Sequence, residues 1–147
     1  MEGSGGTGGT GGTGDVGNSA VAGTYNVTLQ TTETSPGPVD SRVGLATTPT
    51  VSTTFTVFDN NSDGTPESIQ FPGGSPTPLS SDGITSWVFS TFYDGNGESI
   101  IVNAIKNSTT QEISTISVTY LEAGFDPSLG VIDTNYTWTS GTSVSKQ

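Results

Sequence analysis

The sequence predicts an all-β domain built as an antiparallel two-sheet β-sandwich. The ordered segments are short, alternate apolar with polar residues, and are rich in the Thr, Val, Ile and aromatic residues that strands prefer. Turns of Gly, Pro, Asn and Asp separate them, and no segment shows the 3.6-residue apolar period of a helix. Roughly seven or eight such strands, each followed by a turn, are typical of a sandwich.

The first half of the chain centres on one hairpin. Residues 51–71 alternate apolar and polar residues on either side of an acidic turn at residues 59–64. We expect a strand over residues 23–30 before it, then a long loop over residues 31–50 with an edge strand around residues 42–46. A second loop is expected over residues 72–83, because this segment is rich in Pro, Gly and Ser.

The second half predicts four strands, at residues 84–93, 98–105, 112–121 and 131–139. Asp94-Gly95-Asn96-Gly97 predicts a tight hairpin turn, because Asn-Gly supplies positive φ angles. Residues 123–130 are expected to form a loop. The first of these strands is apolar on both faces, which indicates a central or an interface strand. The predicted core residues are Trp87, Phe89, Val118, Tyr120, Tyr136 and Trp138.

Composition excludes several classes of function. Of 147 residues, 14 are acidic and only three are basic, for a net charge of −11. Nucleic acid and anionic membrane surfaces need clustered Lys and Arg, so neither is an expected partner. The absence of His and Cys excludes thiolate zinc sites and Ser-His-Asp triads. No apolar run approaches the roughly 20 residues of a membrane span, so membrane insertion is not expected.

The chain divides into an N-terminal arm and one domain. Residues 1–17 are a low-complexity Gly-Gly-Thr repeat with no core-forming side chains, which predicts a flexible arm. It is either an engineered linker or a natural arm that orders against a neighbouring subunit, and the sequence leaves both open. Residues 18–147 are expected to form the single β-sandwich domain.

The turn at Asp59-x-Asn61-x-Asp63-Gly64-x-x-Glu67 is the candidate metal site. Its oxygen-bearing residues and its glycine have the spacing of the start of a calcium loop, and Thr65 would add a backbone carbonyl. Gln70 replaces the final bidentate acid, and strands rather than helices flank the loop. We therefore predict Asp59, Asn61, Asp63, Thr65 and Glu67 as ligands of a weak Ca²⁺ site. The alternative is a metal-free turn rich in Asn and Asp.

In strand number the chain resembles immunoglobulin-like sandwiches, with a jelly roll as the alternative. It lacks the Cys-Trp-Cys pattern of true immunoglobulin domains, so only the architecture carries over. In its Thr-rich, acidic, β-rich character it resembles small surface proteins of virus particles, of the capsid decoration, turret or spike type. The excess of acids over bases favours a high-salt setting, such as a virus with a halophilic host.

The resemblance implies a non-enzymatic structural protein on a virion surface, which contacts other virion proteins and forms a homo-oligomer. A prokaryotic cell-surface module, for example an archaeal pilus-associated, archaellum or adhesin domain, is the alternative, with an extracellular location. The N-terminus lacks the charged-then-apolar pattern of a signal peptide, which favours the virion. Carboxylate pairs could serve glycoside hydrolysis, but the acids lie mainly in turns and strand edges, so we do not expect an enzyme.

Overall fold

The computed structural model describes residues 16–33, 39–93, 98–126, 128 and 130–147. It is all-β, with 57% of residues in strands. The strands are β2 (Gly23–Glu33), β3 (Thr50–Phe58), β4 (Ser68–Gln70), β5 (Thr77–Asp82), β6 (Ser86–Tyr93), β7 (Glu98–Lys106), β8 (Ile113–Asp126), β9 (Gly130–Thr139) and β10 (Val144–Lys146). In the described part, the one helical element is a three-residue 3-10 helix, η1 (Ser41–Val43), and no helix is long and apolar enough to cross a membrane.

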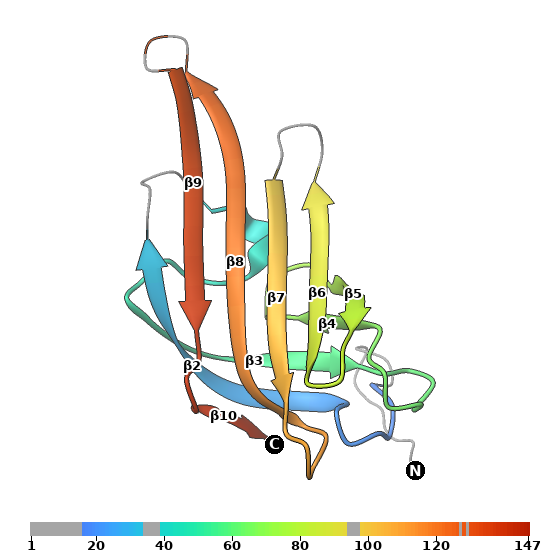
Figure 1. Ribbon diagram of the computed structural model, residues 1–147. Helices are drawn as coiled ribbons and strands as arrows, with labels where there is room; N and C mark the ends of the chain where they lie inside the picture. The colour runs from blue at the N-terminus through green and yellow to red at the C-terminus, as the bar shows by residue number, and fades with distance from the viewer. Residues whose placement is uncertain (1–15, 34–38, 94–97, 127, 129) are drawn as a thin grey trace.

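The sheet closes on itself, so the predicted two-sheet sandwich is wrong, both as an immunoglobulin-like fold and as a jelly roll. Strands β2 to β9 pair antiparallel in chain order, and β2 also pairs with β9. Eight strands therefore form a closed barrel, and β10 is an extra strand beside β2 (Figure 1). Apolar inward-facing residues alternate with polar outward-facing residues in the strands of both barrels and sandwiches, so the sequence pattern could not distinguish the two folds.

Closure depends on the length of β2. One edge of this 11-residue strand pairs with β3 over residues 23–30. Its other edge is shared, because residues 25–27 pair with β10 and residues 30–33 pair with β9. Register shifts in β5–β6 and β7–β8 mark bulges, which increase the local bend that a closed sheet requires. Tertiary pairing of β2 with the distant β9 thus decides the architecture.

Aromatic side chains fill the barrel. Tyr25 stacks on Phe55 with ring centroids 4.8 Å apart, and Tyr136 stacks on Trp138 at 5.8 Å. The Tyr25 hydroxyl donates to the carbonyl of Val21 at 2.8 Å, so its polar end is satisfied inside the core. All six predicted core residues are buried, each 5% exposed or less, and that prediction is confirmed.

Several element predictions differ from the structure. The hairpin over residues 51–71 is present as β3 and β4. The predicted loop over residues 72–83 instead contains β5, and the predicted loop over residues 123–130 is largely strand, because β8 continues to residue 126. In place of an edge strand near residues 42–46, Asp40 caps η1 and Gly44 ends it in a left-handed conformation. The predicted turn at residues 94–97 and most of the arm at residues 1–17 lie outside the described residues.

Candidate functional site

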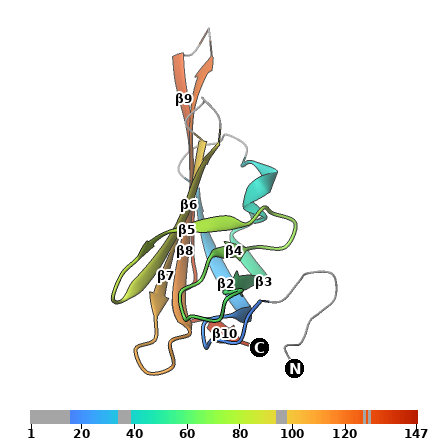
Figure 2. The ribbon, with the colours of Figure 1, turned by 90° about the vertical axis from the view of Figure 1, so that its right-hand side faces the viewer.

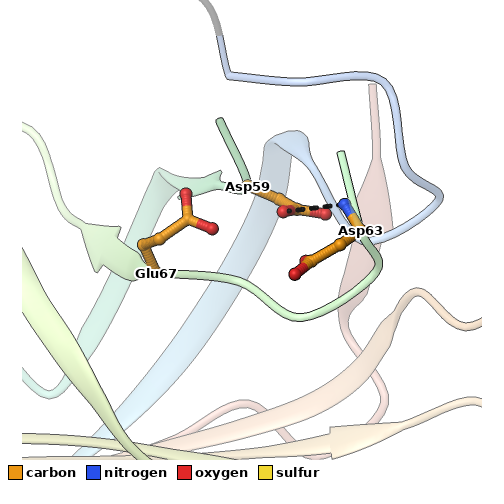
Figure 3. A group of neighbouring side chains, drawn as sticks. All are labelled: Asp59, Asp63 and Glu67. Atoms are coloured by element: carbon orange, nitrogen blue, oxygen red, sulfur yellow. Dashed lines mark hydrogen bonds between the residues drawn. The ribbon is translucent and has the colours of Figure 1, made fainter. Parts of the chain in front are cut away.

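The acidic loop joins β3 to β4. Asp59 follows the last residue of β3, and Glu67 precedes the first residue of β4. The structure brings together three of the five predicted ligands, since carboxylate oxygens of Asp59, Asp63 and Glu67 lie within 4.8 Å of one another (Figure 3). Asp59 is fully buried, whereas Asp63 and Glu67 are exposed. The spacing in the sequence therefore predicted a real cluster of acidic side chains.

Asp59 organises this loop through hydrogen bonds. Its Oδ2 accepts from the backbone N–H of Gly64 at 2.8 Å and from the hydroxyl of Ser19. Its Oδ1 lies 3.4 Å from the backbone N of Asp63 (Figure 3). The backbone N–H of Asp59 donates to the carbonyl of Val16 at 2.8 Å. One buried carboxylate thus holds the turn and the start of the described chain together.

Gly17 permits this close approach. It has a φ of +97°, and a Cβ built on it would lie 1.7 Å from the backbone oxygen of Asp59. Any larger residue would therefore clash with backbone and adopt a strained conformation. Nearby, the backbone N–H of Asn18 donates to the hydroxyl of Ser62 at 2.8 Å. The acidic loop consequently depends on the glycine as well as on its own acids.

The other predicted ligands have less defined positions. Asn61 is exposed, and Thr65 donates its backbone N–H to Asp63 Oδ1 at 2.9 Å. Glu67 Oε1 accepts from the backbone N–H of Asn60 at 2.5 Å. Calcium takes about six to eight oxygens at about 2.3–2.6 Å. Three neighbouring carboxylates could begin such a shell, but each already accepts a backbone N–H. Calcium binding stays a prediction, and a hydrogen-bonded turn explains the same geometry.

A second polar cluster lies at the barrel end near η1, and the sequence pattern did not indicate it. Arg42 of η1 pairs with Asp40 through two hydrogen bonds, Nε to Oδ1 at 2.9 Å and Nη2 to Oδ2 at 2.6 Å. The same Nη2 lies 3.3 Å from Glu98 Oε2 on β7. The guanidinium carbon lies 3.5 Å from the ring centroid of Tyr93 on β6. A single arginine therefore connects η1 to two barrel strands.

Tyr120 of β8 extends this cluster. Its hydroxyl lies 3.1 Å from Glu98 Oε2 and 3.1 Å from Glu122 Oε1, so two carboxyl groups share one phenol. These side chains line an open pocket of about 210 Å³ together with Asp40 and Val39. We define the barrel-end cluster as Asp40, Arg42, Tyr93, Glu98, Tyr120 and Glu122.

The environment moves the pKa values of this cluster in opposite directions. Hydrogen bonds from the Arg42 guanidinium hold the pKa of Asp40 well below its usual range. Burial raises the pKa of Glu98, which is only 7% exposed, and a hydrogen bond with Asp40 adds to this rise. Burial, followed by the neighbouring Glu122, also raises the pKa of Tyr120. The cluster holds one strongly ionised acid, Asp40, beside one that keeps its proton more readily, Glu98.

The contacts of this cluster join η1 to the barrel strands. Glu98 and Glu122 both contact the hydroxyl of Tyr120. The guanidinium N–H groups of Arg42 already bind the carboxylates of Asp40 and Glu98. The signal that could have found the cluster is that Arg42 is one of only three basic residues.

The two lysines are also engaged within the fold. Lys106 Nζ lies 3.0 Å from Asp82 Oδ1, 2.6 Å from the carbonyl oxygen of Gly83 and 4.4 Å from the ring centroid of Trp87. Lys146 Nζ donates to the carbonyl oxygen of Ala20 at 2.7 Å, and burial lowers its pKa. All three basic side chains therefore serve intramolecular contacts.

Comparison of the chain with protein-family models, with curated proteins and with solved structures gives no match in any of the three. Any functional proposal must therefore be argued from the fold and the surface chemistry of the chain itself.

Proposed function

We propose that this chain is a non-enzymatic structural protein on the surface of a virus particle, as a capsid decoration, a turret or a tail surface module. The filled barrel supports this role. An eight-stranded barrel has an interior just wide enough for side chains or for one small ligand. Here Trp87, Trp138, Tyr25, Tyr120 and Phe55 occupy it, each 1% exposed or less. Recognition by this chain therefore takes place on its outside.

The distribution of charge over the outer surface carries the proposal. The outward positions of β2 and β3 over residues 24–30 and 50–56 are all Thr, Ser, Asn or Gln, although the net charge is −11. Interface cores are depleted of charged residues. A neutral face beside the acidic loop between β3 and β4 suits a subunit that packs against neighbours and stays soluble in salt.

The test is the location of the chain in the organism that carries its gene. Particles are purified on a density gradient, and antibody raised against residues 18–147 is applied to intact particles and to cell-envelope fractions. Labelling of intact particles, with the chain sedimenting together with the capsid, supports the proposal. Labelling of filaments or cell envelopes supports the alternative of a prokaryotic surface module. Recovery only in the soluble cell fraction overturns both.

A further inference from the structure

The outer face of β6–β9 differs from the outer face of β2–β3. Four large apolar side chains are exposed in the described part of the chain, and three of them, Phe92, Ile105 and Leu121, lie on β6, β7 and β8. They point outward, because the alternate positions of each strand that face the other way, such as Phe89, Ala104 and Tyr120, are buried in the barrel. Figure 2 shows these strands edge-on, on the side of the molecule opposite η1.

Strand register joins these residues into one patch. Phe92 pairs with Ser99, and Ser99 pairs with Leu121, so the two large side chains flank a serine that is only 4% exposed. Ile101, two residues along β7, is diagonal to both of them, within reach of long side chains. Val88 on β6 and Ile105 on β7 continue the apolar stripe on the far side of Ile101. We call Val88, Phe92, Ile101, Ile105 and Leu121 the apolar stripe.

The rest of this face is neutral. Between the register row of Ser86 and Ile105 and the row of Phe92 and Leu121, the other outward positions of β6–β9 are all Ser, Thr or Asn. The β2–β3 face is neutral too, but its hydroxyls pair with each other, as in Thr24–Thr56 at 3.1 Å and Thr28–Ser52 at 3.3 Å. Burial of the β6–β9 face would therefore gain apolar contact that the β2–β3 face does not offer.

We propose that the outer face of β6–β9 binds the same face of a second copy of this chain, about a two-fold axis. Two copies that each carry a net charge of −11 repel, and this face lets them touch without bringing carboxylates together. A basic partner would instead find its complement on the acidic turns. An apolar, uncharged partner surface fits best, and this chain supplies one.

The area of the β6–β9 face sets the expected affinity of the dimer. Four strands spaced about 4.8 Å apart, over about seven residues of about 3.4 Å each, give at most roughly 450 Å² per partner, because the wall of a barrel is curved. A standard stable interface buries about 800 Å² per partner, so this contact belongs to the weak class. We expect a dimer with a Kd in the micromolar range or above, strengthened by salt. The biological role of this dimer rests on the proposed function, but the measurement of dimerisation does not.

The test is sedimentation velocity of the full chain, residues 1–147, from about 1 μM to about 1 mM in molar KCl. We expect a concentration-dependent shift from monomer to dimer. Phe92→Lys should raise the Kd at least tenfold, although it makes the net charge less negative and so weakens general repulsion. Thr47→Lys, at an exposed position between η1 and β3 on neither face, makes the same charge change and should leave the Kd within about twofold.

Leu121→Ser is a second variant in case Phe92→Lys perturbs folding, which circular dichroism would reveal. Because the chain has no cysteine, Thr119→Cys places a single thiol at the middle of the face, and a short bis-maleimide should cross-link it into dimers. The equivalent Thr47→Cys, outside both faces, should stay monomeric. A wild-type monomer at about 1 mM, or dimers unaffected by both stripe variants, would overturn the inference. A dimer that is missing from virus particles would overturn the proposed function alone.

Discussion

Trp138 tests the closure of the barrel, because it sits where the last strand meets the first. Its register partners are Val118 on β8 and Thr31 on β2. The indole is fully buried and donates its N–H to the carbonyl of Ala46 at 2.9 Å. We expect Trp138→Ala to lower the free energy of unfolding by about 3–5 kcal/mol, the cost of a large aromatic cavity in a packed core.

A second substitution separates packing from hydrogen bonding. Trp138→Phe keeps an aromatic ring against Tyr136 but leaves the carbonyl of Ala46 without its indole donor. We expect it to cost about 1–3 kcal/mol. For a domain of this size, each kcal/mol shifts the melting temperature by about 2–4 °C, so Trp138→Ala should lower it by about 6–20 °C.

The assay is urea unfolding followed by far-UV circular dichroism, with the free energies compared at a common m-value. Ile84→Ala is the control, because Ile84 is 97% exposed and lies in the turn between β5 and β6, outside the apolar stripe. It should stay within about 0.5 kcal/mol of wild type. If Trp138→Ala costs no more than Ile84→Ala, β9 does not close against β2 and the barrel is wrong.

Three further predictions concern charge. Millimolar calcium should raise the melting temperature of wild type relative to EDTA and should not raise that of Asp63→Ala; an equal response of the two proteins would leave the loop a metal-free turn. Glu98→Gln should be more stable than wild type at neutral pH. Folding raises the pKa of Glu98, so this residue stabilises the fold at pH values below its unfolded-state pKa of about 4.3. That stabilisation is lost as the pH rises through its folded-state pKa. The two melting curves should therefore converge near pH 4, and a constant difference across pH would refute this. Finally, the melting temperature should rise between dilute buffer and molar KCl, since salt screens the net charge of −11, and a flat response would remove the case for a high-salt setting.

The strands and the core could be predicted because they depend on local alternation. Trp87 and Trp138 sit on apolar faces that any half-buried strand would display, and both are buried. The predicted strand boundaries were wrong where the local composition was typical of a loop. Thr77–Asp82 forms β5 despite the Pro, Gly and Ser around it, and in the described part of the chain it pairs with β4 and β6. Closure needed a pairing between residues more than 100 positions apart, which no local pattern encodes.

The candidate sites divide in the same way. Asp59, Asp63 and Glu67 meet because they share one short turn, so spacing alone could find them. Arg42 and Glu98 are 56 residues apart and meet only through the fold, as do Tyr120 and Glu98. The apolar stripe is an intermediate case. Apolar residues on both faces of residues 84–93 indicated a central or an interface strand, but only the register across β6, β7 and β8 shows which residues form a continuous surface.

The engagement of every basic side chain affects how this protein is detected. Trypsin cuts after Lys and Arg, and here Arg42 is held by Asp40 and Glu98 while Lys106 is held by Asp82, so we expect the folded chain to resist digestion. Once denatured, it yields Gln147 and the long acidic peptides 1–42, 43–106 and 107–146, which ionise poorly in positive mode. A tryptic inventory of any purified fraction would therefore undercount this chain. A protease that cuts after Asp and Glu, with 14 sites spread along the chain, would reveal it.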